Sequence, residues 1–169
     1  MMKTIGILLL SLILTACASG GRNIQQSHDE SINFADFKSF SVEAVQHMEE
    51  LNAVNDMITA AFVQQLQAKG MRYVKSGEAD LYVRFATKVT SGQEMKAEYI
   101  PAGKGVYTRY NMEAVNEGEF LVNMVDNRTK KVVWKASSIR DMAGVDIGKI
   151  SQEKINEGLS RVLEGFPPQ

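Results

Sequence analysis

Thiol and imidazole side chains, on which most nucleophilic catalysis depends, are almost absent from this chain of 169 residues. It holds one cysteine, Cys17, and two histidines, His28 and His47. His47 opens a short HMEE run, but no second histidine follows at helical spacing, and catalytic zinc usually takes three protein ligands. The usual nucleophile–base pairs are therefore missing. We predict no metal site, no cofactor and no catalytic residue of these types.

Carboxylates are the remaining candidates for acid–base work. Acidic side chains recur along the second half of the chain, at Glu113, Glu117, Glu119, Asp126 and Asp141. A glycosidase-type mechanism needs two such groups about 5–9.5 Å apart in a cleft. A sequence does not give that distance, and solvated surface charge is the favoured interpretation. A cell-wall hydrolase with paired acids stays an alternative, and we expect a protein that is not an enzyme.

Cys17 has a different chemistry, which its position indicates. Lys3 and a short apolar run precede small residues and the cysteine, the pattern of a secretory signal with a core too short to span a bilayer. The tetrapeptide LTAC that ends at Cys17 resembles the bacterial lipobox, in which the thiol receives diacylglycerol before cleavage. We therefore predict a signal peptide over residues 1–16 and a lipidated N-terminus at Cys17. Two or three acyl chains anchor a protein stably to a membrane.

The resemblance also implies a destination. Ala18 and Ser19, which follow the cysteine, are not acidic. In a Gram-negative lipoprotein this pattern favours the outer membrane, with the protein facing the periplasm. The polar residues up to about 31 then read as a flexible tether between the anchor and the folded part.

Removal of residues 1–16 leaves 169 − 16 = 153 residues, the length of one domain, which we place at residues 32–169. Loss of Lys3 leaves 19 − 1 = 18 basic side chains against 20 acidic ones. This balance offers no basic stripe of the kind that nucleic acids need, so we expect no nucleic-acid partner. With Cys17 acylated no thiol remains for a disulfide, and the hydrophobic core must hold the fold.

Hydrophobic periodicity predicts two helices. Apolar residues recur at steps of three and four over about 52–69, with Asn52 as a plausible N-cap and Gly70 just past the end. A second helix follows the N-cap candidate Ser151 and ends before the two prolines near the C-terminus. Both helices have one apolar face to bury.

Alternating residues predict the strands. The clearest run is 81–89, and further runs lie at 38–42 and 71–74. Residues 119–125 and 131–139 flank a polar connector typical of a β-hairpin. The stretch 91–118 is the hardest to interpret: 99–105 resembles a loop and 106–112 a strand. The fold class that results is α+β, a largely antiparallel sheet with two helices packed on one face.

Aromatic residues offer the only candidates for a binding surface. Tyr99, Tyr107 and Tyr110 gather around the ambiguous stretch, where they form either an interaction patch or a cover over the sheet edge. Trp134 lies in an apolar strand, and we predict that it is buried, with stacking on a ligand as the alternative.

Several short motifs resemble a bacterial lipoprotein family known only as domain of unknown function 4136. They are FADFKSF from Phe34, LQAKG from Leu66, ADLYV from Ala79, GEFLV from Gly118, VVW ending at Trp134, and FPP from Phe166. They occur in the family's order and cover most of the predicted domain. The stretch 93–117 departs from the family, because the Gly- and aromatic-rich insertions of many relatives are absent. The resemblance implies a cell-envelope lipoprotein with an α+β domain and supplies no catalytic residues.

These observations favour a non-enzymatic lipoprotein that is tethered to the outer membrane and binds an envelope protein or peptidoglycan. The surface from Gln93 to Tyr110 is the predicted contact region. The alternative is a carrier that holds a small apolar or lipid ligand between helix and sheet, in a cavity lined by Phe62 and Leu66.

Overall fold

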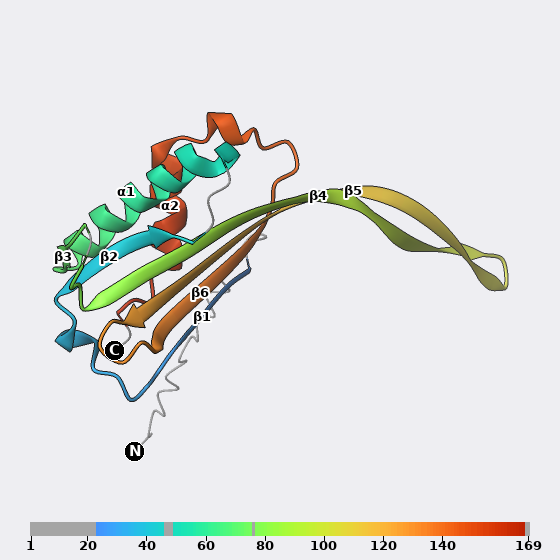
Figure 1. The fold of residues 1–169 in the computed structure, drawn as a ribbon. Coiled ribbons are helices and arrows are strands. Elements are labelled where there is room, and N and C mark those ends of the chain that lie inside the picture. The colour runs from blue at the N-terminus through green and yellow to red at the C-terminus, as the bar shows by residue number, and fades with distance from the viewer. Residues whose placement is uncertain (1–22, 46–48, 76, 168–169) are drawn as a thin grey trace, which may run out of the picture.

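The structure, a computed structural model, describes residues 23–45, 49–75 and 77–167. Two helices lie on the same side of a six-stranded sheet, from which a long hairpin projects (Figure 1). The strands are β1 (Asn23–His28), β2 (Ser39–Ala44), β3 (Arg72–Tyr73), β4 (Leu81–Ala102), β5 (Gly105–Asp126) and β6 (Val132–Asp141), and the helices are α1 (Asn52–Ala68) and α2 (Gln152–Val162). Short 3-10 helices span Phe34–Asp36, Glu49–Leu51 and Ile147–Lys149.

The sheet is mixed, with strand order β1-β6-β5-β4-β2-β3. β2 runs parallel to both β3 and β4, whereas β4, β5, β6 and β1 pair antiparallel. The parallel pairing of β2 and β3 follows from α1, which lies between them in sequence and returns the chain to the same end of the sheet. The predicted α+β class is confirmed, and the expected antiparallel sheet is only partly right because of the two parallel pairings.

The predicted tether is too long at its C-terminal end. Residues Asn23–His28 form β1, which pairs with β6 along its whole length, and Gln26 Nε2 donates to the carbonyl oxygen of Val162 at 2.9 Å. The sequence conceals this strand because its side chains are mostly polar, while backbone hydrogen bonds to β6 hold it at the sheet edge. Asp29, Glu30 and Ser31 follow β1 in a turn, in which the backbone N–H of Ile32 donates to the carbonyl oxygen of Asp29 at 3.2 Å. The signal peptide and residues 17–22 of the predicted tether lie outside the described residues.

Both predicted helices are present. α2 begins as expected, with Ser151 Oγ accepting a hydrogen bond from the backbone N–H of Lys154. α1 begins differently: its N-cap is Leu51, the end of a 3-10 turn, so the proposed cap Asn52 is already helical. Gly70 follows the helix with φ of +88°, a conformation that suits glycine.

The core lies between the helices and the sheet. Phe62 and Leu66 of α1 are fully buried, and so is Trp134. The ring of Trp134 contacts that of Phe166 edge-on, with 5.4 Å between the ring centroids. The burial predicted for Trp134 is confirmed. Stacking of this ring on a ligand is wrong, because neighbouring side chains already enclose it.

The expected loop around 99–105 is instead the end of a hairpin. β4 and β5 pair without a register shift from Leu81 and Asp126 to Ala102 and Gly105. Toward the arm, the pairing of β2 with β4 ends at Phe85 of β4, and the pairing of β6 with β5 ends at Glu117 of β5. Residues 92–115, which we call the arm, are therefore a two-stranded ribbon that extends about 35 Å beyond the sheet (Figure 1).

Candidate functional site

The arm has two chemically different faces, which the strand register defines. Leu81, Val83 and Phe85 point into the core, so every second residue of β4 beyond them shares the core-facing side. On the arm this face consists of Gln93, Met95, Ala97, Tyr99, Pro101, Val106, Thr108, Tyr110, Met112 and Ala114. We call it the apolar face, because it carries no charged residue.

No part of the described chain covers the apolar face. Met95, Tyr99, Val106, Tyr110 and Met112 are between 60% and 72% exposed. Soluble monomers rarely leave so many large apolar side chains side by side in water. A two-stranded ribbon is also marginally stable when it stands alone. The arm therefore has the composition of an interaction surface.

The opposite face of the arm is charged and internally paired. Lys96 Nζ lies 2.6 Å from Glu113 Oε2, and Arg109 binds Glu98 through both Nε and Nη2, at 3.0 and 2.5 Å. The Lys96–Glu113 hydrogen bond is the main cause that raises the pKa of Lys96. These pairs suit a surface that stays in water and distinguish it from the apolar face.

The three tyrosines predicted as an interaction surface all lie exposed on the arm. Tyr99 and Tyr110 are diagonal neighbours on the apolar face, whereas Tyr107, opposite Ile100, points the other way. The patch therefore divides between two faces. Met95 and Met112, which pair directly across the strands, belong to the same surface as Tyr99 and Tyr110. The sequence signal for Met95 is a period-two alternation of apolar and charged residues that resumes at residue 95, after the polar residues at 91–94.

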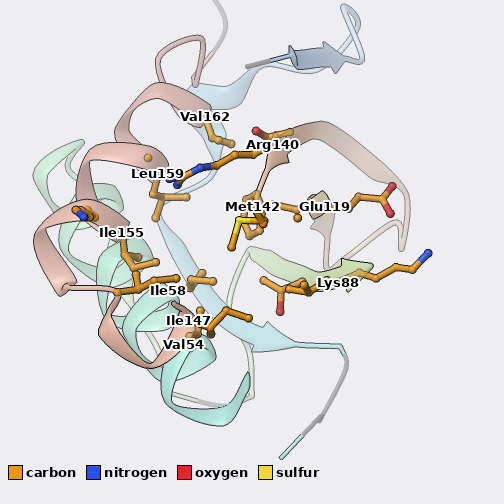
Figure 2. A pocket seen from close by; sticks show the side chains of 18 of the residues that line it. Val54, Ile58, Lys88, Glu119, Arg140, Met142, Ile147, Ile155, Leu159 and Val162 are labelled. Atoms are coloured by element: carbon orange, nitrogen blue, oxygen red, sulfur yellow. The ribbon is translucent and has the colours of Figure 1, made fainter. Parts of the chain in front are cut away.

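A cavity of about 190 Å³ lies at the root of the arm, between the two helices and the sheet. Its walls are mostly apolar and include Val54 and Ile58 of α1, Ile155 and Leu159 of α2, and Met142 (Figure 2). Met142 packs over Gly118, where a Cβ would lie 2.9 Å from its Cγ. A larger residue at position 118 would therefore require the Met142 side chain to move.

Charged residues surround the mouth of this cavity. Figure 2 shows the side chain of Arg140 reaching toward Leu159, whereas Lys88 and Glu119 point away from the cavity. The predicted lining is wrong: Phe62 and Leu66 do not border the cavity, because they are packed fully into the core. The apolar space lies nearer the beginning of α1, at Leu51, Val54 and Ile58.

Two of the acidic candidates stand directly opposite each other, Glu117 on β5 and Asp141 on β6, and both are exposed at the surface. Glu113 is paired with Lys96 on the arm, and Asp126 is buried in the β5–β6 turn. Asp126 Oδ1 accepts from the backbone N–H of Arg128 at 2.8 Å, and Oδ2 accepts from Thr129 Oγ1 at 2.7 Å. Burial raises the pKa of Asp126, but these hydrogen bonds outweigh it and the net pKa is lowered. The carboxylate is thus held ionised as part of a turn.

Asp80, which is not among the candidates predicted from the sequence, accepts three hydrogen bonds at one end of the sheet. Its Oδ2 accepts from the backbone N–H of Lys38, from the backbone N–H of Ser39 and from Ser39 Oγ, at 2.8–2.9 Å. Ser39 Oγ in turn accepts from the backbone N–H of Asp80 at 3.0 Å. The Ser39 hydrogen bond is the main cause that lowers the pKa of Asp80. The pair joins the starts of β2 and β4, at the end of the sheet opposite the arm.

The remaining chemical candidates are placed as follows. His28 ends β1 at the surface, with its ring 6.3 Å from that of Phe34. Cys17 and His47 lie outside the described residues. Within the described ranges, no group of three potential metal ligands comes together. None of the described helices combines the length and the apolar character needed to cross a membrane.

Comparison with known proteins identifies the family. The family described as a domain of unknown function (DUF4136) matches residues 24–168, so the chain belongs to it. The predicted family is thereby confirmed. No curated protein matches the sequence.

Several solved structures are similar to this chain at low sequence identity, one of them with a TM-score above 0.5. A PDZ domain protein from Parabacteroides distasonis is 11% identical with a TM-score of 0.56; the match covers 88% of this chain and 37% of that one. This chain thus spans about a third of that protein. PelC of Paraburkholderia phytofirmans, solved as a dodecamer, is 14% identical with a TM-score of 0.48 over 83% of this chain and 96% of that one. A haemagglutinin homologue from Helicobacter pylori is 9% identical, with a TM-score of 0.43 over 79% and 84% of the two chains.

Proposed function

We propose that this member of the DUF4136 family is a lipoprotein of the bacterial outer membrane that faces the periplasm and acts as an interaction module without catalysis. Acyl chains on Cys17 attach it to the membrane, and the arm makes the contact with its partner. The observation that carries the proposal is the apolar face, whose five large side chains are exposed along a ribbon that projects from the domain.

The composition of the apolar face favours a protein partner over peptidoglycan. Tyrosine and methionine are enriched at protein interfaces, where charged residues are depleted from the centre. Peptidoglycan is a polar polymer of sugars and acidic peptides, and its recognition calls for many hydrogen-bonding or cationic groups. The apolar face has no cationic group, because the charged residues of the arm's strands all lie on the opposite face, and its hydrogen-bonding side chains are limited to Gln93, Thr108 and the two tyrosines.

Crosslinking in living cells tests this proposal on the full-length chain. We expect the wild-type protein to yield a dominant crosslinked product, identified by mass spectrometry. Replacing both Tyr99 and Tyr110 with serine should abolish that product, because it removes the two aromatic anchors of the apolar face. Tyr107→Ser is the matched control, since it removes an equally exposed tyrosine from the opposite face of the same ribbon. An unchanged product in the double variant would contradict the proposal.

The cavity at the root of the arm favours a second candidate, a carrier of a small apolar ligand. Its volume of about 190 Å³ exceeds the ~150 Å³ that suffices to bind benzene in an engineered protein cavity. Gly158 of α2 borders the cavity, and a Cβ at this position meets no atom within 4 Å. A leucine there would occupy part of the space.

Native mass spectrometry of the full-length protein tests the carrier. A bound small molecule should accompany the wild-type chain and the Gly158→Ala variant, and it should be lost from Gly158→Leu. A wild-type protein that carries no such mass, even after incubation with short fatty acids, would exclude this candidate.

A further inference from the structure

We propose that the partner of the apolar face is the same face of a second copy of this chain, so that two arms pack against each other. This inference rests on the proposed function, because it identifies the partner of the same surface. Three properties of the arm carry it: the absence of charge, the arrangement of large and small side chains, and the area available.

Charge sets the first condition for contact between identical surfaces. When two copies meet through the same patch, a charged residue near the symmetry axis meets its own copy, which has the same sign. The apolar face avoids this cost, because its ten residues include no acid and no base. The opposite face, which carries Glu94, Lys96, Glu98, Arg109 and Glu113, could not be buried in this way without desolvating its ion pairs.

The relief of the apolar face is the second property. Tyr99 stands opposite Thr108, and Tyr110 stands opposite Ala97, so each large ring has a small cross-strand neighbour. The face therefore presents two projecting rings and two hollows side by side. A contact through one shared patch requires projections and hollows on the same surface, so that a ring of each copy enters a hollow of the other. Stacked sheets interdigitate in this manner at a spacing of about 10 Å.

The third property is area. The five large side chains, each between 60% and 72% exposed, offer about 600 Å² of accessible surface, and the smaller residues between them bring the face to about 800 Å². A specific protein–protein interface of standard size buries about 800 Å² on each partner. One apolar face is therefore large enough for a stable contact. A second copy also adds a second layer to a ribbon that is marginally stable alone.

Thiol crosslinking in intact cells tests this pairing, because Cys17 is the only cysteine in the sequence and the proposed acylation consumes its thiol. Ala97→Cys places a thiol at the centre of the apolar face of the full-length chain, and Glu94→Cys places one on the opposite face as a control. With a short bismaleimide we expect a product of twice the chain mass from Ala97→Cys, at a yield at least about tenfold above the control. Adding Tyr99→Ser and Tyr110→Ser to Ala97→Cys should reduce that yield about tenfold or more, and adding Tyr107→Ser should leave it unchanged.

The alternative outcomes separate this inference from the proposed function. Equal dimer yields from Ala97→Cys and Glu94→Cys would indicate random collision and overturn the pairing. A thiol at position 97 that links only to a different protein, in a product that needs Tyr99 and Tyr110, would overturn the second copy as partner and leave the interaction module standing. A thiol at 97 that is freely labelled and links to nothing would overturn both. A thiol shielded from maleimide without any crosslinked product would replace the second copy with lipid as the occupant.

Discussion

Removal of the Asp80 carboxylate should destabilise the domain without touching its proposed binding surface. Asp80 receives three hydrogen bonds from Lys38 and Ser39, and Ser39 is only 2% exposed. These contacts join the start of β2 to the start of β4, at one end of the parallel pairing that runs from Phe40 and Leu81 to Ala44 and Phe85. In Asp80→Ala the backbone N–H and the hydroxyl of Ser39 lose their acceptor together.

The magnitude follows from the hydrogen bonds. A hydrogen bond to an ionised group contributes about 1.5–3 kcal/mol, and the exposed position of Asp80 reduces this through solvent screening. We therefore expect the free energy of unfolding to fall by about 2 kcal/mol in Asp80→Ala and by about 1.5 kcal/mol in Ser39→Ala. For a domain of this size, 2 kcal/mol lowers Tm by about 4–8 °C. The double variant should lose clearly less than the two single losses together, with a coupling energy of about 1 kcal/mol.

Urea unfolding followed by circular dichroism measures these differences on the wild type, both single variants and the double variant. Glu78→Ala is the matched control: it removes a neighbouring acid that is exposed, and its expected effect is within about 0.5 kcal/mol of zero. Additive losses in the double variant would refute the view that Asp80 acts through Ser39. A loss in Glu78→Ala equal to that in Asp80→Ala would refute a specific role for the Asp80 carboxylate.

The pH dependence provides an independent check. The pKa of Asp80 is lowered in the folded protein, so its carboxylate stabilises the fold fully at pH values above the unfolded-state pKa of about 3.9. This stabilisation is lost as the pH falls through the lower folded-state pKa. The difference in Tm between the wild type and Asp80→Ala should therefore be constant above about pH 5 and shrink toward pH 2. A difference that persists at pH 2 would assign the effect to packing.

Two further variants probe the cavity and the core. Gly158→Leu should raise the free energy of unfolding by about 1–2 kcal/mol, because leucine is a better helix former than glycine and its side chain enters apolar space. Thermal or urea unfolding measures this change. A free energy of unfolding below that of Gly158→Ala would contradict an accessible cavity. Trp134→Ala should lower the free energy of unfolding by about 3–5 kcal/mol in the same assay, because Trp134 is 1% exposed and its ring packs on Phe166. A decrease of less than about 1 kcal/mol would contradict the place of this ring in the core.

The sequence predicts those elements that pack against a core. The alternation over 81–89 and the apolar stripe of α1 both reflect burial on one side, and both elements lie where they are expected. The arm has no core to impose such a contrast on its residues. Its alternation is interrupted by the polar residues at 91–94, and its end contains Pro101 and Gly103, which indicate a loop. Only the pairing of β4 with β5 reveals that residues on two separate stretches share one face.

The candidate site was predictable to a similar extent. The sequence groups the three tyrosines in one stretch of chain, but a pattern without strand register cannot separate Tyr107 from Tyr99 and Tyr110. β1 was missed for a related reason, because an edge strand with polar side chains is held by its backbone. In both cases the pairing with a neighbouring strand decides the structure, and the sequence of the segment alone does not contain that pairing.

The positions of the family motifs divide the molecule into two ends with different roles. Ser39 and Asp80 belong to two of the motifs, and they meet at the end of the sheet where β4 begins. Their contacts are structural, so the family resemblance identifies what stabilises the scaffold. The arm, residues 92–115, lies at the other end of the same strand and contains none of the motifs quoted above. Since the arm adds few contacts to the core, its surface can change without loss of the scaffold. The binding partner of each relative should therefore follow from its own arm sequence, and exchange of residues 92–115 between two relatives should transfer the partner together with the arm.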